Sequence, residues 1–201
     1  MVLKEPDPLD VRSQEDLDAR VPADRMVYYL RNHFRRSAEV DVLHGLRLRC
    51  GHSVARIDHL LLHAHGIVVV QRSDAVGQLQ VNSDGQWSRL EAPEPAVLSS
   101  PVTHAYIQAL LLKDFLDRHV RQRGFFDQLG LDVLVVLHDG CAVRWPPEGA
   151  MEEVCRREEV FDRVCACIMR SLERQSAEYY LGPSERRTLG RFLNRSHQPL
   201  A

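Results

Sequence analysis

The sequence predicts a mixed α/β fold around a single hydrophobic core. Three observations lead to this prediction: an amphipathic helical pattern from residue 24, a series of strand-like segments between residues 40 and 82, and a return to helical spacing near residue 101. A further apolar run at 131–138 and helical patterns beyond it complete an order of helix, strands, helix, strand, helix. A chain of 201 residues can bury one such core.

The first helix begins at Asp24 and carries apolar residues on one face and arginines on the other. Before it, residues 1–22 hold three prolines, many charges and no regular period. The chain is therefore divided into an extended N-terminal arm (1–22), a core (23–150) and a C-terminal helical extension packed on the core (151–201).

Four segments after the first helix have the composition of strands. Gly66 allows a tight hairpin between the second and the third segment, so we expect an antiparallel meander. The segments are VDVLHGLRLRC (40–50), SVARIDHLLLHA (53–64), GIVVVQRS (66–73) and GQLQVN (77–82).

The second half of the core alternates helix and strand. Ser100 as cap and Pro101 in the first turn start a helix over 101–120. LDVLVVLH (131–138) is typical of a strand covered on both faces, and CAVRW (141–145) follows a turn. Helices are expected over 151–176 and from residue 183.

Composition narrows the class of protein. Hydrophobic residues make up 44% and charged residues 27% of the chain. No apolar run approaches the roughly 20 residues of a membrane span. The acidic N-terminus does not resemble a signal peptide. We therefore expect a cytoplasmic protein without a membrane partner. The net charge of −2 argues against a strongly basic nucleic-acid binder but allows a local patch. The odd number of five cysteines predicts reduced thiols.

Several segments together carry a family resemblance. They are RMVYYLRNHF, ARIDHLLLHAHGIVVVQ, Gly77 followed by QLQV, Trp87, and SSPVTHA, in this order over residues 23–138. In these features the chain resembles the nuclease-related domain (NERD) family, a branch of the PD-(D/E)xK nuclease superfamily. The resemblance implies a restriction-endonuclease-like core, with a mixed sheet of four to five strands flanked by helices. In such nucleases an acid on the first helix, an Asp on one strand and a Glu-x-Lys on the next surround a divalent metal.

Carried over residue by residue, the resemblance places the catalytic pattern on altered residues. The strand Asp falls on Asp58, the Glu on Gln71 and the Lys on Ser73. The helix acid falls on Ala23 or Asp24, and only Asp24 would preserve the carboxylate. An amide oxygen at position 71 can still ligate Mg²⁺, but a missing lysine removes a group worth on the order of 10²–10⁴ in rate.

The altered pattern predicts a degenerate catalytic centre. Alternation along a strand puts Gln71 and Ser73 on one face and Arg72 on the other, so Arg72 does not replace the lysine without a bulge. If activity remains, Asp58 and Gln71 would hold Mg²⁺ with Asp24; otherwise no cofactor is expected. The chain has 24 arginines but only two lysines, Lys4 and Lys113, so few lysines could take the place of the missing catalytic lysine.

Nucleic acid is the first partner that the resemblance implies, with DNA as its expected form. Arg31, Arg35 and Arg36 on the first helix could contact phosphates or form a solvated face. Arg72 is a further candidate, and His104 stands where the family has a Gln after the Ser-Pro helix start.

Three functions remain open from the sequence. The first is a nucleic-acid-binding, scaffolding or regulatory module with a dismantled nuclease centre. The second is a working Mg²⁺-dependent endonuclease with a rearranged centre, and the third is a protein-interaction module with an unknown partner.

His59, His63 and His65 share a strand face and could bind metal, although histidines at such spacing more often cover a half-exposed sheet face. The oligomeric state does not follow from these patterns.

Overall fold

The computed structural model describes residues 1–8, 14–90, 95–120, 125–174 and 180–199, without the side chains of 14–23 and 125. The strands are β1 (Val2–Lys4), β2 (Asp41–Cys50), β3 (Ser53–His63), β4 (Gly66–Arg72), β5 (Gly77–Val81), β6 (Trp87–Arg89), β7 (Ala96–Leu98), β8 (Gly130–Val136), β9 (Cys141–Arg144) and β10 (Val154–Cys155). The helices are α1 (Gln14–Phe34), α2 (Pro101–His119), α3 (Phe125–Gln128), α4 (Val160–Arg174) and α5 (Pro183–Ser196), with a 3₁₀ turn at Arg157–Glu159.

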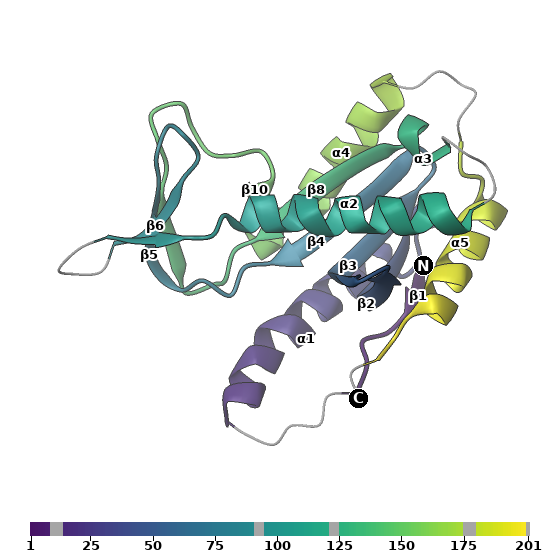
Figure 1. The fold of residues 1–201 in the computed structure, drawn as a ribbon, viewed down its shortest axis with the longest axis horizontal. Coiled ribbons are helices and arrows are strands. Elements are labelled where there is room, and N and C mark those ends of the chain that lie inside the picture. Colours follow the sequence, from purple (N-terminus) through teal and green to yellow (C-terminus); the bar gives the residue numbers. More distant parts are fainter. Residues whose placement is uncertain (9–13, 91–94, 121–124, 175–179, 200–201) are drawn as a thin grey trace.

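The larger sheet has the strand order β1-β2-β3-β4-β8-β10. Strands β2, β3 and β4 are antiparallel, whereas β1, β8 and β10 pair in parallel with their neighbours. The predicted mixed sheet flanked by helices is confirmed (Figure 1). It has six strands rather than four to five, because β1 and β10 extend its two edges.

A second sheet of order β7-β6-β5-β9 projects from the first (Figure 1). The expected meander therefore ends at β4, and β5 pairs with β6 and β9 instead. The chain leaves the larger sheet for this smaller one twice, after β4 and again after β8. Both passages run in the same direction, because β4 is parallel to β8 and β5 is parallel to β9.

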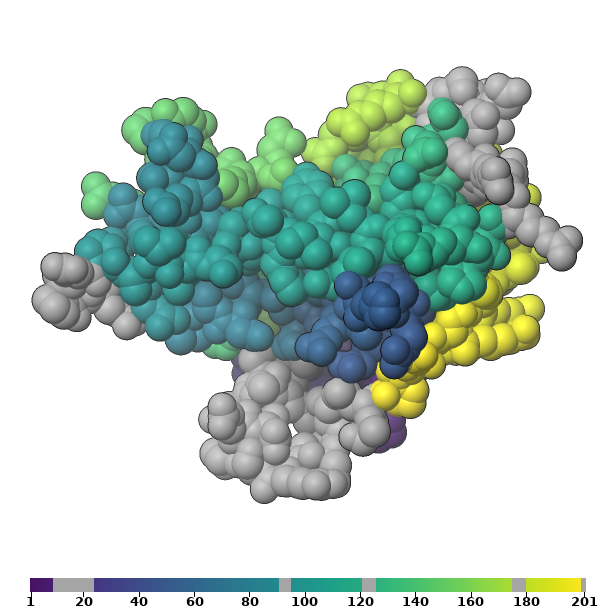
Figure 2. Space-filling model, in the orientation of Figure 1, coloured from purple at the N-terminus to yellow at the C-terminus, as the bar shows by residue number. Residues whose placement is uncertain are grey.

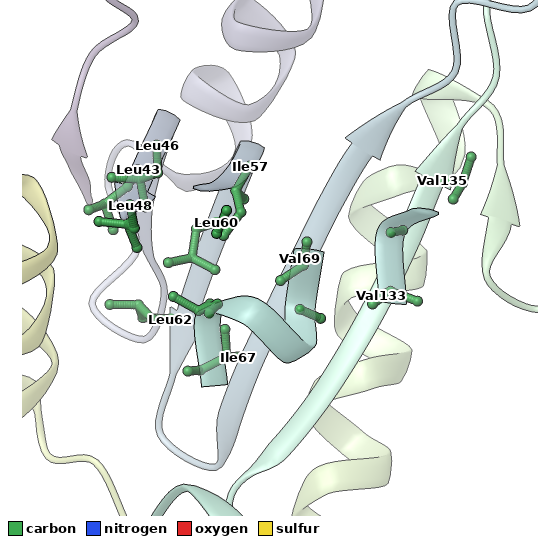
Figure 3. Close-up of a cluster of buried hydrophobic side chains, with 14 of the residues drawn as sticks. Leu43, Leu46, Leu48, Ile57, Leu60, Leu62, Ile67, Val69, Val133 and Val135 are labelled. Atoms are coloured by element: carbon green, nitrogen blue, oxygen red, sulfur yellow. The ribbon is translucent and has the colours of Figure 1, made fainter. Parts of the chain in front are cut away.

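Helices cover both faces of the larger sheet and divide its core into two clusters. On one face α2 and α5 pack on a cluster that includes Leu46, Ile57 and Val69 (Figure 3). On the other face α1 and α4 pack on Val68 and Val70. Helix α2 crosses the front of the molecule in Figure 2. It is capped, as predicted, by Ser100, whose side chain accepts from the Thr103 N–H.

The ends of the chain differ from the sequence-based expectation. The proposed arm contains β1, which pairs with the edge of β2, and α1 starts ten residues before Asp24, at Gln14. The helix expected over 151–176 is preceded by β10 and the 3₁₀ turn and begins at Val160. In both places a short segment pairs with the free backbone groups at an edge of the larger sheet. Such pairing between distant segments cannot be recognised from local helical periodicity.

All five cysteines are free, as predicted. None of the helices in the described ranges combines the length and the apolarity needed to cross a bilayer.

Candidate functional site

The candidate site lies where β2 and β3 lose their regular alternation. Leu43 and Leu46 point into the same core cluster although they are three residues apart, and Ile57 and Leu60 do the same. In a regular strand such residues face opposite sides. The pairing runs from His44↔His59 to Leu46↔Ile57 and omits Gly45, which has φ +61°, and Asp58. The irregularity is thus centred on the Asp58 position.

Asp58 is held by the end of β4. One carboxylate oxygen, Oδ2, accepts a hydrogen bond of 2.8 Å from the Arg72 backbone N–H and lies 3.8 Å from Arg72 Nε. The side chain keeps 36% of its surface exposed. Burial raises the pKa of Asp58, and the charge of Arg72 opposes this shift. The carboxylate is therefore already engaged by two groups of one residue.

Gln71 is buried and bridges the backbone of β3. Its Oε1 accepts from the Asp58 N–H at 3.1 Å, and its Nε2 donates to the Arg56 carbonyl at 2.6 Å. The β3–β4 ladder ends at His59↔Val70, so this amide takes the place of the missing strand partner. Gln108 of α2 assists, because its Oε1 accepts from the Arg56 N–H at 2.7 Å. A carboxylate at position 71 could not donate the second of these bonds.

Ser73 is also buried and has local partners. Its N–H donates to the Val136 carbonyl at 2.8 Å, and its hydroxyl lies 3.4 Å from the Ala75 N–H that donates to it. Both lysines are engaged elsewhere. The Lys113 ammonium pairs with Asp127, and buried Lys4 donates to the His44 carbonyl at 3.0 Å.

A cavity of about 890 Å³ lies between α1, the irregular part of β2 and β3, and residues 5–8; we call it the α1 cavity. Asp24, Arg31, Asp58 and Arg72 line it, whereas Gln71 and Ser73 do not. The structure therefore brings two of the expected acids together with two of the expected arginines. The two residues at the Glu and Lys positions of the family pattern contribute to the sheet instead.

Most charges around the α1 cavity are paired. Glu5 pairs with Arg31 at 2.5 Å. Asp7 accepts from Lys4 at 2.8 Å and lies 2.7 Å from His197 Nε2.

Arg47 and Arg56 also line the cavity and have no acidic partner within the described ranges. The sequence did not single them out, because strand periodicity does not reveal the interruption at Gly45.

His44 and His59 form a buried pair in the wall of this cavity. Their Nδ1 atoms are 2.9 Å apart and the rings meet edge to face. Burial lowers the pKa of His44 to about 4 and that of His59 well below its usual value, so both rings are neutral at pH 7. The expected half-exposed histidine face was wrong for His59 and His63, which are 3% and 1% exposed.

The remaining predicted nucleic-acid contacts lie off the α1 cavity. Arg35 and Arg36 are exposed just beyond the end of α1. His104 is exposed on α2, where its Nε2 lies 3.5 Å from Gln108 Nε2. All three positions are accessible. The charge of His104 acts on Asp58 and opposes the rise of its pKa, whereas Arg35 and Arg36 lie beyond the end of α1.

The model of the nuclease-related domain family matches residues 22–139, which is more than half of the chain. The chain belongs to the nuclease-related domain family. No curated protein and no solved structure matched it. The NERD assignment agrees with the mixed sheet flanked by helices.

The NERD fold implies a Mg²⁺ ion, and the residues present fit it poorly. The Gln71 oxygen accepts from Asp58 N–H, and Asp58 Oδ2 accepts from Arg72 N–H. Among the described residues, no group of three His, Cys, Asp or Glu side chains could hold a metal ion. Carboxylate oxygens open to a hard cation are what such a centre requires, and the surroundings of Asp58 do not gather them.

Proposed function

We propose that this NERD protein binds nucleic acid along the α1 cavity without cutting it. The observation that carries the proposal is the Gln71 amide, which donates and accepts within the sheet where the family places a metal-ligating carboxylate. The arginines of the cavity supply the contacts to phosphate that sequence-independent binding needs. The first function left open by the sequence is therefore the best supported.

Arg56 and Arg72 form the proposed contact with the nucleic-acid backbone. Arg56 is exposed and has no acidic partner in the described part of the chain, and Arg72 reaches the cavity while lying 3.8 Å from Asp58. A phosphate near Arg72 would compete with the Asp58 carboxylate. Binding should therefore be moderate and should weaken as salt rises.

Affinity for a labelled single-stranded oligonucleotide and for a duplex tests the binding part of the proposal. Replacing Arg56 and Arg72 together by Ala should weaken binding and lower the salt slope by about 1 for each lost contact. The matched control is Arg35→Ala with Arg36→Ala, two exposed arginines outside the cavity. Equal losses in the two pairs would overturn the assignment of the cavity.

A cleavage assay tests the catalytic part. Plasmid and single-stranded DNA are incubated with the protein in Mg²⁺ and in Mn²⁺, beside Asp58→Ala. We expect no cleavage above that of the variant. Cleavage that Asp58→Ala loses would favour the second function, an endonuclease with a rearranged centre.

A protein-interaction module is the second candidate, and an apolar stripe on α2 favours it. Tyr106, Ile107 and Leu110 are 42%, 48% and 61% exposed on this helix. An apolar patch of this kind often marks an interface. Light scattering of the protein beside Ile107→Ser with Leu110→Ser tests self-association. A mass above the monomer that the variant loses would support this candidate, and a monomer in both would count against self-association.

A further inference from the structure

Four buried nitrogen atoms beside the α1 cavity have no hydrogen-bond partner in the described ranges. They are the Nε atoms of Arg31 and Arg47 and the Nε2 atoms of His44 and His59. All four residues line the cavity. Native proteins pair nearly all of their buried polar atoms, so a cluster of unpaired ones needs an explanation. A ligand that supplies the missing partners is a direct one.

The hydrogen bond between the two imidazoles determines what each can offer to a ligand. Both rings are neutral, and one Nδ1 must donate the hydrogen of the 2.9 Å contact while the other accepts it. The donating ring then has a lone pair at Nε2, and the accepting ring carries its hydrogen there. His44 and His59 therefore present one donor and one acceptor, whichever ring has which role.

Together with the two guanidinium Nε–H groups, the cluster offers three donors and one acceptor. A carboxylate brings two oxygens and no hydrogen, and sulfate or a phosphodiester brings oxygens only. A phosphate monoester has three terminal oxygens. Its second ionisation lies near pH 6, so the dianion predominates at pH 7 and the monoanion, which carries one hydroxyl hydrogen, is the minor form that this cluster would select. Its donors and acceptors match the cluster in kind and number.

Four acids and four arginines line the α1 cavity, so an anion there depends on a guanidinium that no carboxylate neutralises. Glu5 and Asp58 already pair with Arg31 and Arg72, whereas Arg47 has no acidic partner among the described residues. The Arg47 Nε is buried and is itself one of the four unpaired nitrogens. An incoming phosphate would therefore meet one guanidinium that no carboxylate neutralises.

We infer that the α1 cavity binds a phosphate monoester, through Arg31, Arg47, His44 and His59, and thereby holds the terminal phosphate of a nucleic-acid strand. The inference rests on the proposed function, because it names the part of the nucleic acid that this cavity takes. The volume of about 890 Å³ suits one or two nucleotides rather than a duplex. Exposed Tyr28 lines the same cavity and can stack on the base next to the phosphate.

The test compares single-stranded oligonucleotides of one sequence that differ only at their ends. One carries a 5′-phosphate, one a 3′-phosphate and one only hydroxyl groups. We expect one phosphorylated end to bind at least about tenfold tighter than the hydroxyl ends, the effect of charge-assisted hydrogen bonds at one group. Inorganic phosphate should compete with that oligonucleotide better than sulfate does.

Arg47→Gln should remove most of the preference for the phosphorylated end. Arg49→Gln is the matched control, because Arg49 is exposed on the same strand and does not line the cavity. An independent readout is the imidazole ¹H–¹⁵N spectrum of the unaltered protein. Inorganic phosphate should shift the Nε2 signals of His44 and His59, and sulfate should shift them less.

The outcomes separate this inference from the proposed function. Equal affinity for all three oligonucleotides, with imidazole signals that phosphate leaves in place, would overturn the inference and leave nucleic-acid binding standing. Imidazole shifts with inorganic phosphate but no oligonucleotide binding would overturn the proposed function and identify a small phosphorylated molecule as the source of the phosphate. Loss of preference in both arginine variants would overturn the assignment to Arg47.

Discussion

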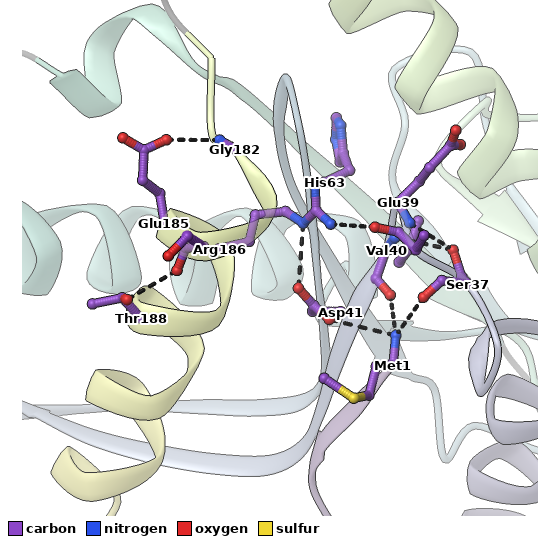
Figure 4. Close-up of polar contacts among 12 residues, drawn as sticks. Met1, Ser37, Glu39, Val40, Asp41, His63, Gly182, Glu185, Arg186 and Thr188 are labelled. Atoms are coloured by element: carbon purple, nitrogen blue, oxygen red, sulfur yellow. Dashed lines mark hydrogen bonds and ion pairs between the residues drawn. The ribbon is translucent and has the colours of Figure 1, made fainter.

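Strand β2 buries two polar residues near its start, Asp41 and His44, and only one of them has all its partners among the described residues. At the start of the strand, Asp41 Oδ2 lies 3.2 Å from Arg186 Nε, and the Met1 ammonium lies 3.5 Å from the other oxygen (Figure 4). Arg186 also donates to the Ala38 carbonyl at 2.6 Å. Three residues after Asp41, His44 has an Nε2 atom without a partner in the described ranges. Paired polar groups hold the fold together, whereas unpaired ones beside a cavity point to a ligand.

The largest expected effect comes from breaking the paired end. Asp41→Ala should lower the free energy of unfolding by about 3–5 kcal/mol, because it leaves the buried Arg186 charge without its carboxylate. Urea unfolding measures the loss. Asp41→Leu combined with Arg186→Met should recover much of it, since an apolar pair avoids the uncompensated charge. An Asp41→Ala variant as stable as the parent would contradict the contrast between Asp41 and His44.

Acid should destabilise the protein through its buried neutral histidines. Burial lowers the pKa of His44 and of His63 to about 4, so the unfolded chain takes up these protons first as pH falls. The stability that these neutral rings contribute is complete above about pH 6.5 and is lost progressively down to about pH 4, by about 3 kcal/mol for each ring at most. Urea unfolding at pH 7.5, 5.5 and 4.5 measures it. His44→Asn should flatten the dependence, and exposed His52→Asn should leave it unchanged.

Restoring the family carboxylate should destabilise the protein. Gln71→Glu loses the donor to the Arg56 carbonyl and places a charge in a buried position, which should cost about 1–3 kcal/mol. Gln78→Glu, at an exposed position of β5, is the matched control and should change little. Thermal unfolding compares them. Mg²⁺-dependent cleavage by Gln71→Glu with Ser73→Lys would show that the metal centre can still be rebuilt.

The smallest effect is expected at an exposed ion pair. Lys113→Met should lower the free energy of unfolding by less than about 1 kcal/mol, because exposed pairs contribute little. Lys4→Met should be more harmful, since this buried ammonium donates to Asp7 and to the His44 carbonyl. Urea unfolding of the two variants gives the comparison, and equal losses would contradict it.

Sequence patterns predicted the elements that local chemistry specifies. The Ser100 cap, the strand that starts at Gly66 and the apolar run at β8 appear where expected, because each depends on nearby residues. Gly66 also shows a limit of such reasoning. A Cβ there would lie 2.4 Å from the Gly130 carbonyl oxygen, a constraint between strands that only the paired sheet reveals.

The candidate site was predicted only in part, for a related reason. Asp58, Gln71 and Ser73 were found from a family pattern, but the bonds of the Gln71 amide depend on where the β3–β4 ladder stops. Arg47 and His44 enter the α1 cavity because Gly45, with a positive φ, interrupts the alternation of β2. Periodicity assumes a regular strand, so it places residues wrongly beyond such an interruption.

The double passage between the two sheets has a mechanical consequence. Two parallel segments join them, tied together where the Ser73 N–H donates to Val136 and the Gly77 N–H donates to Gly140. Arg156 braces the second segment, with donated bonds to the His138 and Cys141 carbonyls. Because these two outward segments are hydrogen-bonded to each other, they resist twisting that separate segments would allow. A load applied to the smaller sheet would therefore be transmitted as strain to residues 71–73, the stretch that holds Asp58.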